Sequence, residues 1–141
     1  MASIHIETII HAPAEQVWAA LAAVGEAHSA FAGVLSGCRL EREDVRVVTF
    51  VNGLMVKEQI VNVDPTRMRI AYAVIESELA HHSASMQVDA TTDRACRFVW
   101  ITDVLPHDAA AWIRPLMEQG AEALKTNLET APGAVGALGE I

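Results

Sequence analysis

Residues 108–129, DAAAWIRPLMEQGAEALKTNLE, decide how this chain folds. Apolar residues recur there every three or four positions, and the charged residues fall on the opposite side. This spacing predicts one long amphipathic helix whose apolar stripe is buried against the rest of the molecule. The stripe consists of Ala109, Ile113, Leu116, Met117, Gly120, Leu124 and Leu128.

Gly120 lies in the middle of this stripe, where a leucine would pack best. A glycine inside a helix costs about 1 kcal/mol relative to alanine, so its presence requires a compensating gain. One explanation is that a neighbouring backbone approaches the helix closely. The other is that the missing side chain leaves space, in which case the helix covers a cavity.

Upstream of this helix the apolar pattern alternates with period two, which is typical of β-strands. Asn52-Gly53 is a strong hairpin signal, and Asp64-Pro65-Thr66 is a second turn signal. Short turns between consecutive strands predict an antiparallel meander. The strand-like runs are GCRLERE (37–43), RVVTFV (46–51), LMVKEQIVNV (54–63), RMRIAYAVI (67–75), HHSASMQVD (81–89) and ACRFVWITDVL (95–105).

The N-terminal part adds one strand and two short helices. Residues 3–10 alternate as a strand does, Pro13 suits the first turn of a helix, and Gly33 ends a second short helix. The predicted order is therefore strand, two helices, six strands and a long helix. We expect an α+β fold in which a curled, seven-stranded antiparallel sheet wraps round the C-terminal helix.

Five segments in this order carry a family resemblance. They are HAPAEQVWAAL (11–21), GLMVKEQIVNVD (53–64), RIAYAVIE (69–76), FVWITDVLP (98–106) and GAEALKTNLE (120–129). Together they resemble the START-like helix-grip superfamily, also called SRPBCC, and within it the polyketide cyclase/dehydrase and lipid-transport group. The resemblance implies a deep cavity between sheet and helix that takes lipids, sterols, hormones or polyketides. Only some members of the superfamily are enzymes.

Composition and charge exclude several other classes. The chain has 141 residues and a net charge of −8, and its ten basic residues are scattered, so we expect no nucleic-acid partner. It has no apolar run long enough to span a membrane and no secretory signal, so we expect a cytoplasmic protein. We expect one ligand-binding domain over residues 1–130 and a flexible tail over residues 131–141. Cys38 and Cys96 form no metal or disulfide motif.

Alternation within the strands predicts which side chains face the helix. In the run 54–63 both faces are equally apolar, and we place Glu58 inward because Lys57 is easier to solvate on the open face. If Glu58 instead faces outward, it is an ordinary solvated residue. The other inward residues are Tyr72, then His82, Ala84, Met86 and Val88, and then Cys96, Phe98, Trp100, Thr102 and Val104.

Most candidate site residues follow from these faces and from the helical stripe. His28 is a candidate because the family resemblance implies that the cavity mouth lies near its short helix, although a surface histidine is the plainer interpretation. His82, Glu58 and Tyr72 are the candidates for acid–base catalysis, although a hydrogen-bonded core histidine and a packing tyrosine are the plainer interpretations. We predict no metal site, because the strand neighbours His81 and His82 point to opposite faces. We predict no cofactor, because the sequence has no phosphate-binding glycine loop and no dinucleotide fingerprint. The ligand-binding candidates are His28, Phe31, Glu58, Tyr72, His82, Met86, Phe98, Trp100, Ile113, Met117 and Gly120.

Three functions remain open, in order of preference. The first is binding of an apolar small molecule, because the inward set is mostly apolar with a few polar groups. The second is a cyclase or dehydratase, which would need a base and a donor close together. The third is a protein-interaction module of the chaperone-activator type, or a homodimer, through an apolar patch on the outer sheet face. That patch would consist of Ala71, Ala73, Ile75, Val99 and Ile101.

Overall fold

The computed structural model describes residues 2–130. The predicted tail, residues 131–141, lies outside the described residues. The elements are, in chain order, β1 (Ala2–Ile10), α1 (Ala14–Ala22), the 3₁₀ helix η1 (Val24–Glu26), α2 (Ala27–Ala30), β2 (Leu35–Arg42), β3 (Val45–Phe50), β4 (Met55–Asp64), β5 (Arg69–Ile75), β6 (His81–Thr92), β7 (Ala95–Leu105), the 3₁₀ helix η2 (His107–Ala109) and α3 (Ala110–Thr130).

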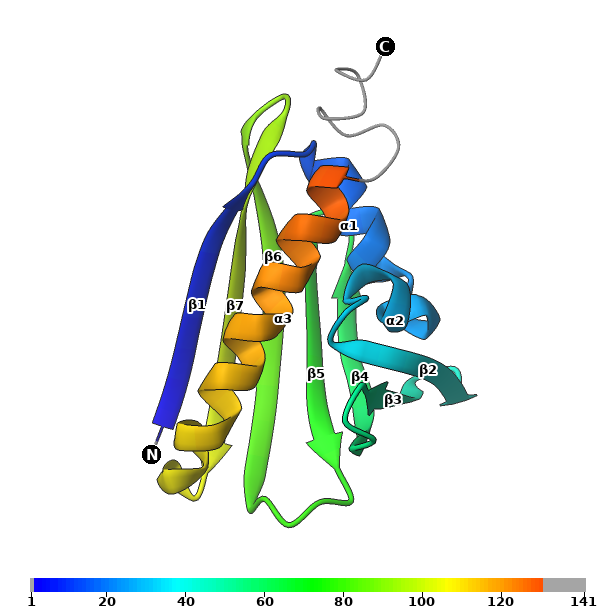
Figure 1. The fold of residues 1–141 in the computed structure, drawn as a ribbon, viewed down its shortest axis with the longest axis vertical. Helices are drawn as coiled ribbons and strands as arrows, with labels where there is room; N and C mark the ends of the chain where they lie inside the picture. The colour runs from blue at the N-terminus through cyan, green and yellow to red at the C-terminus, as the bar shows by residue number, and fades with distance from the viewer. Residues whose placement is uncertain (1, 131–141) are drawn as a thin grey trace.

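The strands form one seven-stranded sheet in the order β1-β7-β6-β5-β4-β3-β2, and every neighbouring pair is antiparallel. Consecutive strands from β2 to β7 are therefore neighbours, and β1 joins the far side of β7. This arrangement confirms the predicted meander and the predicted α+β helix-grip fold. In Figure 1 the sheet curls behind α3, and the end of α2 is joined to the last turns of that helix through Asn127, which donates to the Ala30 carbonyl.

Helix α3 packs on the concave face of the sheet along the predicted stripe. Ile113, Met117, Leu124 and Leu128 are all buried, and Gly120 is buried between them. They join a core that includes Ile4, Val17, Ile70, Phe98 and Val104. Burial also confirms the predicted inward faces, because alternate residues of β6 and β7 are buried from Ala84 to Val88 and from Cys96 to Val104.

The C-terminal end of α3 is tied to the rest of the molecule by polar contacts. The Lys125 ammonium donates to the Ile9 carbonyl and to the Glu129 carboxylate, at 2.7 Å in both cases. The Asn127 amide donates to the Ala30 and Ala32 carbonyls, at 3.0 Å each. These contacts close one end of the space between sheet and helix.

The β3–β4 hairpin does not use the two-residue turn that Asn-Gly usually forms. The Gly53 amide donates to the Phe50 carbonyl, and the Phe50 amide donates to the Leu54 carbonyl, both at 2.8 Å. Gly53 has a φ of +93°, whereas Asn52 is not among the residues with positive φ. This is a three-residue loop with a glycine bulge. It pairs Val48 with Val56 and places Arg46 opposite Glu58 on the same face.

The outer sheet face is mixed in character. Strand β6 lies between β5 and β7 and presents Ser83, Ser85 and Gln87 outward, opposite Asp103, Ile101 and Val99. These polar side chains separate Val99 and Ile101 on β7 from Ala71 and Ala73 on β5. All of the residues predicted to form an outer apolar patch are only half-buried.

Candidate ligand-binding pocket

A pocket of about 690 Å³ lies between the first half of α3 and the strands β3 to β7. Its floor consists of inward side chains of the sheet, and Ala109, Ile113 and Met117 form the helix wall. The β3–β4 hairpin and the loop between β5 and β6 border its mouth. Most of the side chains that line it are aliphatic or aromatic, as in typical small-molecule pockets.

The mouth of the pocket carries exposed apolar side chains. Leu54 and Met55 on the hairpin are 44% and 57% exposed, and Trp112 on α3 is 54% exposed. Glu76, Glu78 and Asp108 also line the pocket and are exposed, so they give the rim an acidic character. The entrance therefore combines apolar surface with negative charge.

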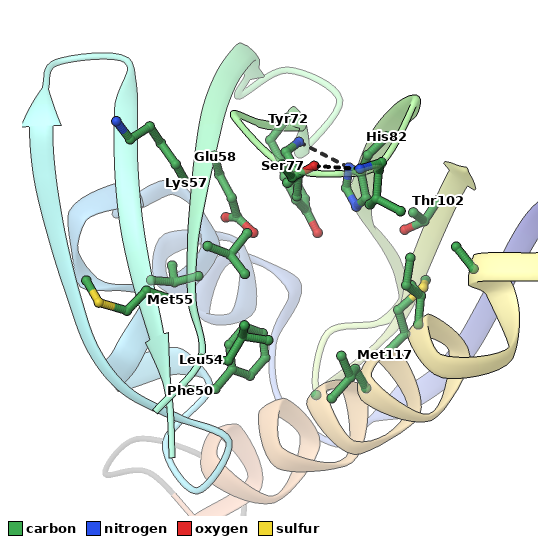
Figure 2. A pocket seen from close by; sticks show the side chains of 18 of the residues that line it. Phe50, Leu54, Met55, Lys57, Glu58, Tyr72, Ser77, His82, Thr102 and Met117 are labelled. Carbon is green, nitrogen blue, oxygen red and sulfur yellow. Dashed lines mark hydrogen bonds between the residues drawn. The ribbon is translucent and has the colours of Figure 1, made fainter. Parts of the chain in front are cut away.

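A buried ion pair lies in the strand wall. Arg46 Nε donates to Glu58 Oε1 at 2.7 Å, and Arg46 also donates to the Val24 carbonyl at 3.2 Å. Both residues are buried, at 5% and 9% exposure. Burial alone would lower the pKa of the Arg46 guanidinium, but the charge and hydrogen bond of Glu58 outweigh this effect and raise it. Figure 2 shows the Glu58 side chain directed into the pocket from β4.

Tyr72 connects this ion pair to the aromatic part of the pocket. The Arg46 guanidinium lies 5.5 Å from the centre of the Tyr72 ring, which allows a cation–π interaction. The Trp100 indole N–H donates to the Tyr72 hydroxyl at 3.1 Å. Burial, followed by the charge of Glu58, raises the pKa of Tyr72, so the phenol stays protonated. No acceptor among the described residues takes its hydroxyl hydrogen.

His82 faces the same space from β6. Its Nδ1 accepts a hydrogen bond from the Val74 amide at 3.1 Å, so in the neutral ring the proton is on Nε2. Burial, with a smaller contribution from His81, lowers the pKa of His82 and favours this neutral form. The His82 and Tyr72 rings are tilted, with centroids 5.9 Å apart.

Thr102 contributes a hydroxyl to the pocket from β7. The residue is 1% exposed, and its Oγ1 has no hydrogen-bond partner among the described residues. A buried polar group of this kind normally has a partner, because an unpaired one costs free energy. Figure 2 shows Thr102 beside His82 on the pocket wall.

Gly120 lines the pocket, as the second explanation expects, but the space beside it is filled by a side chain. A Cβ at this position would lie 3.0 Å from Cζ3 of Trp100 and 3.8 Å from Cδ1 of Phe31. The glycine therefore makes room for an indole side chain, and neither a strand backbone nor empty space explains it. Phe31 and Phe98 pack against the same indole, with ring centroids 5.9 Å and 6.0 Å away.

The structure brings most of the predicted site residues together. Nine line the pocket: Phe31, Glu58, Tyr72, His82, Met86, Trp100, Ile113, Met117 and Gly120. Two do not line it. Phe98 is fully buried behind Trp100, and His28 lies on α2 outside the pocket lining.

The sequence analysis missed several residues of the pocket. Arg46 was not assigned to a face, because that assignment depends on the hairpin register. Thr102 was placed inward but not included in the site. Leu54, Met55 and Trp112 lie at the mouth because of how the hairpin and helix are placed, and no local pattern indicated this.

The chemistry available in the pocket is that of neutral donors and one compensated ion pair. Within residues 2–130, no group of three or more histidine, cysteine, aspartate or glutamate side chains is placed to hold a metal ion. None of the helices in the same range is long and apolar enough to cross a membrane. Glu58, Tyr72 and His82 are the groups of the pocket's inner wall that can exchange a proton, and further ionisable groups in the pocket lining are Lys57, Glu76, Glu78 and Asp108.

The fold and the pocket define a helix-grip protein with a cavity between sheet and helix. The family of polyketide cyclases/dehydrases and lipid-transport proteins matches residues 1–129, and this chain belongs to that family. Among curated proteins, no sequence matches the chain.

Solved structures share this fold at low sequence identity. The protein XoxI from Bacillus cereus has a TM-score of 0.83 and 16% identity, with 92% of this chain and 97% of that chain covered. The di-domain ARO/CYC BexL has a TM-score of 0.75 and 17% identity, with 92% and 47% covered. A START superfamily protein from Mycobacterium smegmatis has a TM-score of 0.72 and 14% identity, with 90% and 97% covered.

Proposed function

We propose that this protein binds a hydrophobic small molecule, lipid-like or polyketide-like, in the pocket between the sheet and α3. The pocket carries the proposal, because its volume of about 690 Å³ falls within the range of about 300 to 1,000 Å³ that ligand pockets occupy. The exposed Leu54, Met55 and Trp112 at its mouth provide apolar surface along which such a ligand can enter. Family membership supports the same class of ligand.

A fluorescent apolar probe and a blocked pocket test this proposal. N-phenyl-1-naphthylamine should bind with a rise in fluorescence, and Val74→Trp should weaken that binding by about tenfold or more, because the indole fills the pocket that Val74 lines. Ile101→Trp is the matched control, because Ile101 faces the outer side of the sheet, opposite His5 and Ser85. Equal binding by wild type and Val74→Trp would contradict a ligand site in the pocket.

Native mass spectrometry of freshly purified protein gives an independent readout. An occupied pocket should appear as an added mass that disappears on denaturation. The same added mass should be absent from Val74→Trp and present in Ile101→Trp. An added mass that is unchanged in Val74→Trp would place the bound molecule elsewhere on the protein.

A cyclase or dehydratase remains the second candidate, because Glu58, Tyr72 and His82 line one pocket. The hydrogen bonds support this candidate less well than binding. The Nδ1 lone pair of His82 is used by Val74, and Glu58 Oε1 is paired with Arg46. Of these groups, only the second carboxylate oxygen of Glu58 is left to act as a general base.

The enzymatic candidate predicts enolisation of a β-keto compound, since a cyclase of this type needs a carbanion. Exchange of the α-protons of a β-keto ester in D₂O, followed by NMR, should then be faster with protein than without it. Glu58→Gln, which keeps an acceptor for Arg46 but removes the base, should abolish the acceleration. No acceleration by the wild type would remove this candidate.

A further inference from the structure

Three polar side chains on the inner wall of the pocket lie around one alanine of the sheet. Tyr72 on β5 lies directly opposite Ala84 on β6, and Ala84 lies directly opposite Thr102 on β7. His82 is the next inward residue along β6 from Ala84, since side chains two apart share a face. Tyr72, Thr102 and His82 therefore flank Ala84 on the inner face of the sheet, and all three line the pocket.

Each of the three groups has a hydrogen that no other described residue accepts. The Tyr72 hydroxyl oxygen already accepts from Trp100, so its hydrogen is directed elsewhere. The His82 Nδ1 accepts a hydrogen bond from the Val74 amide, so the Nε2–H is the donor that the ring can offer to a ligand. Thr102 Oγ1 is buried and has no partner in residues 2–130. The Thr102 hydroxyl is therefore an exception to the rule that buried polar groups are satisfied.

We infer that Tyr72, His82 and Thr102 form a receptor for an uncharged hydrogen-bond acceptor, such as a ketone or ester carbonyl, on the inner end of the ligand. This inference rests on the proposed binding function and specifies the class of ligand. The acceptor would lie between these three side chains and take hydrogen bonds from them. The apolar body of the ligand would extend toward Met117, Leu54 and the mouth.

The charges around the receptor favour a neutral acceptor over an ion. Arg46, the cation in the strand wall, is already neutralised by Glu58 at 2.7 Å. Lys57, the other cation of the lining, is paired with Glu41 and Glu76 at 3.0 and 3.3 Å. Glu78 and Asp108 at the rim repel an entering anion, and the chain carries a net charge of −8. Burial lowers the pKa of His82, and it raises the pKa of Tyr72, so both groups are neutral donors at pH 7.

A matched pair of ligands tests the inference. 9-Fluorenone and fluorene have the same fused ring system, but only fluorenone carries a carbonyl. A purely apolar pocket would prefer fluorene, because burying an unpaired carbonyl costs free energy. We expect fluorenone to displace N-phenyl-1-naphthylamine with a dissociation constant about fivefold lower than that of fluorene, the gain of about one net hydrogen bond.

Substitutions in the receptor should remove this preference. The ratio of the fluorene to the fluorenone dissociation constant should fall toward one, or below it, in at least one of the two variants Thr102→Val and Tyr72→Phe. Thr102→Val keeps the shape of the side chain and should melt no lower than the wild type, because no other described residue uses its hydroxyl. Ser85→Ala is the control, because it removes a hydroxyl from the outer face of β6, opposite Ile101. It should leave the preference unchanged.

The outcomes separate the two proposals. If the probe and both ring systems bind but fluorene binds as tightly as fluorenone or more tightly, the carbonyl receptor is wrong and the binding function stands. A preference for fluorenone that persists in both Thr102→Val and Tyr72→Phe also overturns the receptor. If neither the probe nor either ring system binds, the proposed function itself fails.

Discussion

The side chains that matter most at the residue scale are Arg46 and Glu58, which form an ion pair inside an apolar wall. Taking two charges out of water is costly, and their mutual attraction offsets this only while both are present. The pair is held by the 2.7 Å hydrogen bond, by the Val24 carbonyl and by the Tyr72 ring. Removing one partner leaves an uncompensated charge beside the pocket.

The ion pair therefore gives a direct stability prediction. Glu58→Leu should lower the free energy of unfolding by about 3 to 5 kcal/mol, whereas Arg46→Met combined with Glu58→Leu should cost much less. Urea unfolding followed by circular dichroism measures both. Arg67→Ala, which breaks an ion pair with Asp64 in which the Arg67 side chain is 72% exposed, is the control and should cost about 0.5 kcal/mol or less. A double variant as unstable as the single one would contradict this account.

His82 gives a prediction about pH. Its pKa in the folded protein is lowered by burial first and by His81 second, so the unfolded chain binds a proton more readily. Stability should therefore be constant above about pH 6.5, the unfolded value, and fall as pH decreases below it. In His82→Asn, whose side-chain oxygen can still accept from Val74, the fall over this window should be smaller. Thermal melts of both proteins between about pH 5 and pH 8, the range in which histidine titrates, measure this fall in stability. Identical pH profiles would show that His82 does not contribute.

At the scale of elements, the β3–β4 hairpin sets the composition of the pocket wall. Its three-residue loop pairs Arg46 with Glu58, whereas a two-residue Asn-Gly turn would shift the register by one residue. Such a shift moves side chains to the opposite face, and Arg46 would then leave the face that Glu58 occupies. The loop requires the positive φ of +93° at Gly53.

Gly53→Ala should therefore destabilise the protein by about 1 to 2 kcal/mol, the cost of a left-handed backbone for a residue with a Cβ. No atom lies within 4 Å of the added Cβ, so the effect comes from the backbone alone. Gly37→Ala is the control. Gly37 lies in β2 without a positive φ, and its Cβ would meet Thr49 at an ordinary 3.8 Å. If the urea midpoint shifts equally in both variants, the positive φ of Gly53 is not what the loop requires.

Helix α3 gives the second prediction at this scale, through the contact of Gly120 with Trp100. Alanine at this position gains about 1 kcal/mol of helix propensity but places a Cβ 3.0 Å from the indole. The indole is held by Tyr72 and Phe98, so we expect Gly120→Ala to destabilise by about 1 kcal/mol, because overpacking outweighs propensity. With Trp100→Phe as background, the same change should be neutral or stabilising. Differential scanning calorimetry of the four proteins measures this, and a stabilised Gly120→Ala single variant would show that the indole moves freely.

At the scale of the whole molecule, the two ends of the space between sheet and helix differ. One end is closed by Lys125, Asn127 and Glu129, which bind Ile9, Ala30, Ala32 and His11. The other end is bordered by the β3–β4 hairpin, the β5–β6 loop and the first turns of α3, where Trp112 is exposed. The ligand would thus enter the pocket at the end that these polar contacts do not close.

This asymmetry predicts where a ligand changes local stability. Saturating N-phenyl-1-naphthylamine should slow amide hydrogen exchange most in residues 50–55, 76–80 and 107–116, and least in residues 123–130. The physical reason is that segments with few buried contacts open most readily and gain most from a bound ligand. Exchange measured by mass spectrometry on peptides from the wild type and from Val74→Trp provides the test. Uniform slowing along the chain would contradict a pocket that opens at one end.

Much of this architecture could be predicted from local patterns. Alternation in β6 and β7 identified their inward residues, and the helical stripe identified the buried face of α3, because a side chain's direction repeats with a fixed period. The same rule placed Tyr72 and His82 on the pocket face and favoured Glu58 there. His28, which was proposed from the family resemblance and not from this rule, does not line the pocket. Phe98 faces inward as the rule predicts, but it packs against Trp100 in the core and does not line the pocket.

The order of elements, the buried stripe of α3 and most of the side chains that face it can be predicted from the amino-acid sequence, since these depend on periodicity and turn residues within a few positions. The contact of Arg46 with Glu58, the position of Trp100 beside Gly120 and the grouping of Tyr72, His82 and Thr102 on one wall arise only in the folded chain. These features depend on hairpin register and on contacts between strands that are distant in the chain. A difference of one residue in register changes them, and no local pattern records such a difference.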